Sequence, residues 1–97
     1  MTRYPDRKCL AVDVDGTLLA GGRINPHVVA FARARMADGY DVYVWSARGK
    51  EHARQAAEMA GLDVPAFAKP SLILDDAGWS WVRYTRVASR DDVVGGE

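Results

Sequence analysis

Three short apolar segments alternate along the chain with two segments of helical periodicity. Residues 8–14 are almost continuously apolar before an acidic end, which is typical of a strand buried on both faces of a parallel sheet. Residues 41–46 and 71–75 predict a second and a third strand, because they are rich in β-branched, aromatic or large aliphatic side chains. Residues 64–67 predict at most a short edge strand, since they contain Pro65.

Two segments between these strands predict helices. The first begins at the Asn25-Pro26 pair, an N-cap residue followed by proline at the first helical position, and ends before Gly39. The second covers about residues 50–60 and carries a face of small alanines that can lie close to a sheet. The predicted buried positions of the two helices are Val28, Phe31, Ala32, Met36, Ala53, Ala56, Ala57 and Ala60.

Strands separated by helices favour a parallel, doubly wound α/β sheet with right-handed crossovers. We expect one domain over residues 1–97, with residues 88–97 as a flexible tail. Residues 79–87 fit either a last strand or a short helix, and both interpretations stay open.

Composition narrows the class of protein. A 48% hydrophobic content indicates a globular chain, and 13 basic residues against 13 acidic ones leave no net charge to attract nucleic acid or anionic lipid. The single cysteine, Cys9, excludes an internal disulfide and an all-cysteine zinc site, and we expect it in the core. No apolar run approaches the roughly 20 residues of a membrane span, and the start lacks the apolar segment of a secretory signal. We expect a cytoplasmic protein without membrane partners.

Acidic side chains follow the first and third predicted strands, and Ser46 ends the second. Ligands of parallel sheets bind at the carboxyl ends of the strands, so we expect these residues at one edge. Carboxylates that converge there repel one another unless a cation lies among them, and oxygen ligands without histidine or thiolate favour Mg²⁺. The predicted metal ligands are Asp13, Asp15, Asp75 and Asp76, and which of the last two binds directly stays open.

The Asp-x-Asp spacing also predicts a reaction. Asp13 can attack phosphorus to give an acyl phosphate, while Asp15 protonates the departing oxygen and then takes a proton from water. Gly16 lets the chain turn sharply, which would leave backbone N–H groups facing an anion. The predicted phosphate-binding residues are Gly16, Thr17, Ser46 and Lys69. Arg48 is a candidate for a substrate contact or for a surface ion pair.

The sequence Asp13-Val14-Asp15-Gly16-Thr17 resembles the first motif of the haloacid dehalogenase superfamily. Ser46, Lys69 and the Asp75-Asp76 pair follow in the order of the other three motifs, and the match covers residues 8–76. An acid two places after the nucleophile resembles the phosphatase branch, unlike the dehalogenases and P-type ATPases.

This resemblance implies a Rossmann-like three-layer α/β/α sandwich with a small, mostly parallel sheet, and a Mg²⁺-dependent phosphomonoester hydrolase that works through an aspartyl-phosphate. It gives Asp13 the roles of nucleophile and metal ligand. Asp15 would be the general acid and base and would offer its backbone carbonyl to the metal.

The intervals between the motifs are short for this superfamily. Only 32 residues (14–45) separate Asp13 from Ser46, and only 22 (47–68) separate Ser46 from Lys69. Each interval is filled by a helix and a turn or flap, so neither has room for a cap domain. The resemblance therefore implies an open, capless site that acts on a large, self-covering substrate or is covered by a second copy in a homo-oligomer.

Other functions remain open at this stage. One alternative is a phosphatase for nucleic-acid 3′-phosphate ends; another is a non-catalytic protein that binds phosphate and magnesium; and transfer to an acceptor other than water is a third. Trp79 and Trp81, flanked by arginines, fit core or interface packing better than base stacking. Both histidines, His27 and His52, are expected at the solvated surface. The flanking arginines are Arg83, Arg86 and Arg90.

Overall fold

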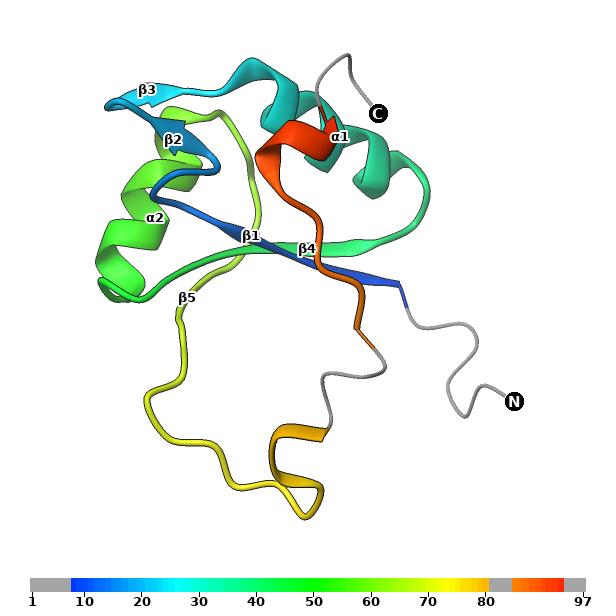
Figure 1. The fold of residues 1–97 in the computed structure, drawn as a ribbon. Coiled ribbons are helices and arrows are strands. Elements are labelled where there is room, and N and C mark those ends of the chain that lie inside the picture. The colour runs from blue at the N-terminus through cyan, green and yellow to red at the C-terminus, as the bar shows by residue number, and fades with distance from the viewer. Residues whose placement is uncertain (1–7, 81–84, 94–97) are drawn as a thin grey trace.

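The structure, a computed structural model, describes residues 8–80 and 85–93 (Figure 1). It is a small α/β fold, in which three strands form a parallel sheet in the order β1-β4-β5 and two short strands form an antiparallel hairpin. The strands are β1 (Cys9–Asp13), β2 (Leu19–Ala20), β3 (Arg23–Ile24), β4 (Asp41–Ser46) and β5 (Ala66–Ala68). The helices are α1 (Pro26–Ala37), α2 (Lys50–Met59) and the 3-10 helix η2 (Arg90–Val93). The predicted parallel α/β class is confirmed.

Both long helices pack on the same face of the sheet. Along β4, Val42, Val44 and Ser46 are buried, whereas the alternating residues Tyr43 and Trp45 are only partly buried. One hydrophobic core joins the buried face of the sheet to both helices. Its members in these elements are Val12, Val28, Ala32, Val42, Val44, Ala53, Ala56 and Ala57. The described residues therefore show two layers, helices on sheet.

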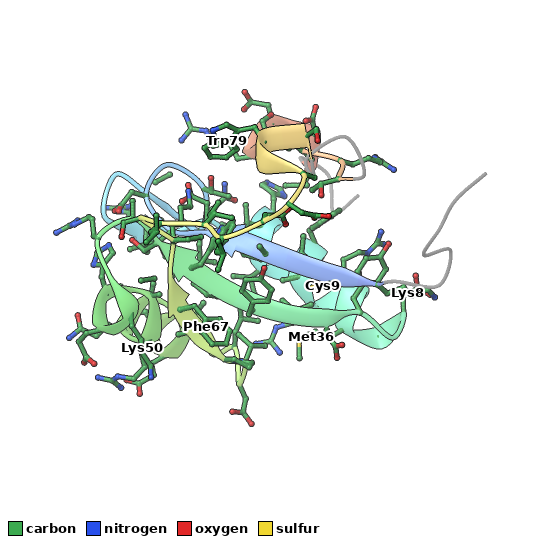
Figure 2. The ribbon with its side chains drawn as sticks, turned by 90° about the horizontal axis from the view of Figure 1, so that it is seen from below. Lys8, Cys9, Met36, Lys50, Phe67 and Trp79 are labelled. Atoms are coloured by element: carbon green, nitrogen blue, oxygen red, sulfur yellow. The ribbon has the colours of Figure 1, made fainter. Side chains whose placement is uncertain are left out.

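The opposite face of the sheet carries an aromatic row. The register places Asp13 beside Trp45 and Trp45 beside Phe67, so these three side chains lie on one face. Tyr43 packs edge-to-face against Trp45 and Phe67, with centroid distances of 5.8 and 5.4 Å. Figure 2 looks toward this face from below, and Cys9 is labelled there. The prediction that Cys9 lies in the core is wrong, because strand alternation points it away from the helices, where it is exposed.

The third strand differs from the predicted one. Residues 71–75 do not form a strand, and Leu72 and Leu74 are 88% and 103% exposed. The strand is instead Ala66–Ala68, where only a short edge strand was expected. This segment is the first extended stretch after α2, and it pairs with the free edge of β4 before the chain reaches residues 71–75. Pro65 lies just before it, and its carbonyl accepts the Val44 N–H at 3.0 Å.

The C-terminal part returns to the body of the protein. Of residues 88–97, expected as a flexible tail, Arg90–Val93 form η2, and Val93 is buried in the core close to α1. Trp79, in a short 3-10 turn at residues 78–80, is 75% exposed, and Trp81 lies outside the described residues, as does Arg83. Within the described ranges, no helix combines the length and apolar character needed to cross a membrane.

The N-terminus of α1 offers a test of the helix prediction. The Asn25 side chain accepts a hydrogen bond from the His27 N–H at 3.0 Å, and Pro26 follows it, as predicted. Replacing Asn25 with alanine removes this acceptor and should lower the free energy of unfolding by about 0.5–2 kcal/mol. Asn25→Ser keeps a cap and should be close to wild type. Urea unfolding measures both, and equal losses would contradict the capping role.

Candidate active site

Asp13 is the centre of a small polar cluster at the carboxyl end of β1. The Lys69 Nζ lies 2.9 Å from one carboxylate oxygen, and the Thr17 hydroxyl donates to the other at 3.1 Å. Lys69 comes directly after β5, and its backbone N–H donates to the Ser46 carbonyl at 2.9 Å. Its ammonium also lies 5.7 Å from the ring centroid of Trp45. The structure thus brings together three predicted residues, from the end of β1, the turn after it and the end of β5, with Asp13 held by two donors.

Asp15 lies in the turn after β1 and faces the start of α2. The His52 Nε2 is 3.2 and 3.3 Å from its two carboxylate oxygens, and Arg48 NH1 is 3.5 Å from one of them. His52 was expected at the solvated surface, so its place beside Asp15 is a finding that sequence reasoning missed. The available signal was its position in the first turn of a helix that follows a strand's carboxyl end. Arg48 forms the ion pair that was one of its two predicted roles.

Ser46 organises the turn between β4 and α2. It is 2% exposed, its hydroxyl accepts the Arg48 N–H at 3.0 Å, and its carbonyl accepts the Gly49 N–H at 3.2 Å. Gly49 has φ 111°, a conformation that side-chain-bearing residues rarely adopt. The same carbonyl holds the backbone of Lys69, so one buried residue fixes the bases of both cationic side chains.

The Gly16 turn differs from the expected anion cradle. The Gly16 N–H donates to the Leu19 carbonyl at 2.8 Å, and the Thr17 N–H to the Val14 carbonyl at 3.1 Å. Gly16 does supply the sharp turn, with φ 83°. The expectation that these two amides are free for an anion is wrong, because the turn itself uses them. Arg90 NH1 donates to the Gly16 carbonyl at 3.2 Å, which links η2 to this turn.

Asp75 and Asp76 are not brought to this cluster. Both are exposed, and the Asp75 carboxylate accepts the Ala77 N–H at 2.7 Å in a local turn. Their segment does not pair with the sheet, so nothing directs them to its carboxyl edge. Among the described residues, no three histidine, cysteine, aspartate or glutamate side chains gather closely enough to hold a metal. A hollow of about 260 Å³ lies within this segment and is lined by seven residues between Pro70 and Trp79, Asp75 among them, and not by Asp13 or Asp15.

The pKa values of two side chains outside the cluster, Tyr43 and Glu51, are shifted by their surroundings. Burial raises the pKa of Tyr43, and the nearby Cys9 thiol raises it further. On α2, a hydrogen bond from Arg54 lowers the pKa of Glu51, with a smaller contribution from the positive charge itself. Glu51 therefore forms an ion pair with Arg54 on the exposed side of α2, and Arg54 also forms an ion pair with Glu58.

The site combines a carboxylate held by lysine and threonine with a second carboxylate held by histidine and arginine. The first can act as a nucleophile beside a cation that attracts phosphate, and the second can exchange a proton with a leaving group or water. Comparison of the chain with models of protein families, with curated proteins and with solved structures finds no match.

Proposed function

We propose that the chain is a capless phosphatase of the haloacid dehalogenase type, a Mg²⁺-dependent phosphomonoester hydrolase with Asp13 as nucleophile. The observation that carries the proposal is the 2.9 Å contact between Asp13 and Lys69, which come from strands on either side of β4. A lysine beside the nucleophile can attract a phosphate dianion to a carboxylate that would otherwise repel it. Thr17 orients the same carboxylate.

The reaction uses both aspartates. A carboxylate oxygen of Asp13 attacks phosphorus, the bond from phosphorus to the ester oxygen breaks, and Asp15 gives that oxygen its proton. Water then attacks the phosphorus of the aspartyl-phosphate, Asp15 takes back a proton, and the Asp13 carboxylate leaves. Inorganic phosphate and an alcohol are the products. Ser46 ends β4, the strand between those that carry Asp13 and Lys69, and its proposed role is to bind the phosphate. Its hydroxyl is buried and accepts the Arg48 N–H.

The residues fit magnesium only in part. The Asp13 carboxylate and the Asp15 carbonyl are oxygen donors of the kind that Mg²⁺ accepts. The third donor, Asp75 or Asp76, lies away from them in the described residues. Bound magnesium would supply charge stabilisation for the transferring phosphoryl group. We assign no step to it, and metal dependence stays a prediction.

A Rossmann-like three-layer sandwich would need a further layer over the face that carries Tyr43, Trp45 and Phe67. An exposed catalytic edge suits a large phosphorylated substrate or a second copy of the chain. A nucleic-acid end is the macromolecular alternative, and the cytoplasm is the proposed location.

Phosphate release tests the function directly. Wild-type protein would be assayed with 4-nitrophenyl phosphate, free nucleotides and a 3′-phosphorylated oligonucleotide, each with Mg²⁺ and with EDTA. Turnover that needs Mg²⁺ would support the proposal, and preference for the oligonucleotide would favour the nucleic-acid alternative. Binding of inorganic phosphate or Mg²⁺ without turnover of any substrate would instead support a non-catalytic binding protein. Equal turnover with EDTA would contradict the metal requirement.

Lys69 gives a second test of the same site. Replacing it with methionine keeps most of the side chain's bulk and removes the charge beside Asp13. A lost charge-assisted contact of about 1.5–3 kcal/mol should lower kcat/KM for an aryl phosphate by roughly 10- to 100-fold. Lys8→Met is the matched control, since Lys8 lies at the other end of β1 and donates to the Asp38 carbonyl. A similar loss in both variants would contradict the assigned role.

A further inference from the structure

We propose that His52 is a positioning residue that holds the Asp15 carboxylate in place for proton transfer. The proposal rests on the proposed phosphatase function and deepens it. His52 does not contact Asp13, Thr17 or Lys69 through any hydrogen bond in the described part of the chain, and its side chain reaches Asp15 instead. Its role is therefore tied to the second carboxylate rather than to the nucleophile.

The contact between His52 and Asp15 is partly enclosed, because α2 holds the histidine side chain against the protein. The His52 side chain is 22% exposed against 49% for Asp15, so the histidine is the more enclosed partner. Nε2 lies almost equally far from both carboxylate oxygens, at 3.2 and 3.3 Å. With the proton on Nε2, one N–H can donate between the two oxygens and fix the plane of the carboxylate.

A second side chain, from the turn before α2, also contacts the Asp15 carboxylate. Arg48, in the β4–α2 turn, approaches one Asp15 oxygen at 3.5 Å, and the Ser46 hydroxyl accepts its backbone N–H. Arg48 is 67% exposed, so histidine is the better-defined of the two contacts.

A fixed Asp15 matters most when the leaving group is poor. An alkyl phosphate needs a proton on its departing oxygen, whereas 4-nitrophenolate leaves with little help. The value of kcat/KM reports only the steps up to phosphoenzyme formation, in which Asp15 serves as the acid. Loss of the positioning residue should therefore lower kcat/KM much more for an alkyl phosphate than for the aryl phosphate.

The experiment compares wild type, His52→Ala, His52→Gln and His27→Ala on both substrates. We expect His52→Ala to raise the aryl-to-alkyl ratio of kcat/KM at least about tenfold, as the general-acid contribution is weakened. His52→Gln should recover part of the loss, because its amide N–H can replace Nε2–H. His27, exposed in the first turn of α1, is the matched control. An unchanged ratio in His52→Ala, or no recovery with glutamine, would overturn the proposal.

A measurement without turnover separates this proposal from the proposed function. Thermal unfolding of His52→Ala, Asp15→Asn and the double variant should show non-additive shifts in Tm, because the two side chains are in contact. Additive shifts would refute the contact even in an active enzyme. Non-additive shifts in a protein that hydrolyses no phosphomonoester would confirm the contact, refute the proposed function and overturn the positioning role of His52 with it.

Discussion

Asp13→Asn is expected to abolish phosphate release while leaving the fold intact. The amide cannot attack phosphorus to form an aspartyl-phosphate, so turnover should fall by at least about a thousandfold, as for other nucleophile replacements. Asparagine keeps the size of the side chain and an oxygen that can accept the Thr17 hydrogen bond. Since the Asp13 side chain is 35% exposed, the substitution leaves no buried cavity. Phosphate release and mass spectrometry of the acid-quenched protein measure the two consequences, lost turnover and lost phosphoenzyme.

Asp41→Asn is the matched control for this prediction. Asp41 is exposed at the opposite, amino end of β4, so the same chemical change is made on the same sheet away from the site. It should retain wild-type turnover. Full activity in Asp13→Asn would rule out the nucleophile assignment, and equal loss in both variants would indicate a general effect of the charge change.

The sequence pattern predicted part of the arrangement at the carboxyl edge of the sheet. Asp13 and Ser46 were expected at the carboxyl ends of neighbouring strands, and the parallel pairing of β1 with β4 places both strand ends at one edge. Lys69 was expected before the third strand, but it follows β5 instead, because that strand is Ala66–Ala68. Strand ends can be inferred from sequence because apolar runs stop where polar residues begin. The contact between Lys69 and Asp13 depends on this different third strand, which brings Lys69 to the carboxyl edge.

Other parts of the site could not be predicted because they depend on hydrogen bonds made inside turns. The amides of Gly16 and Thr17 bond to carbonyls of their own turn, and no pattern of residue types distinguishes this from an open anion cradle. The contact of His52 with Asp15 depends on the rotation of α2 about its axis. That rotation follows from the packing of Ala53, Ala56 and Ala57 on the sheet, which leaves His52 toward the carboxyl edge.

The third strand of the sheet also could not be predicted from local sequence. Residues 71–75 have a strong strand pattern, yet the short segment Ala66–Ala68 pairs with β4. Local propensity describes what a segment can form, whereas the path of the chain after α2 decides which segment reaches the free edge first. The Asp75-Asp76 pair stays away from Asp13 for this reason.

Leu18→Ala should be the most destabilising single substitution considered for this fold. Leu18 follows the first motif, is 0% exposed, and is one of the largest fully buried side chains in the described residues. Removing it costs transfer free energy and leaves a cavity, about 2–5 kcal/mol in total. A chain of this size has a free energy of unfolding on the order of 5–15 kcal/mol, so the loss is a large part of the whole. Urea unfolding monitored by circular dichroism measures it.

Leu72→Ala makes the same chemical change at a position that is 88% exposed, and should shift the free energy of unfolding by less than about 0.5 kcal/mol. The two variants therefore differ only in how deeply the replaced leucine is buried. A loss for Leu72→Ala as large as that for Leu18→Ala would mean that residues 71–75 are buried as a strand, which would carry Asp75 and Asp76 toward the sheet. A small loss places this segment outside the core, and a metal site at Asp13 and Asp15 would then need its third ligand from elsewhere.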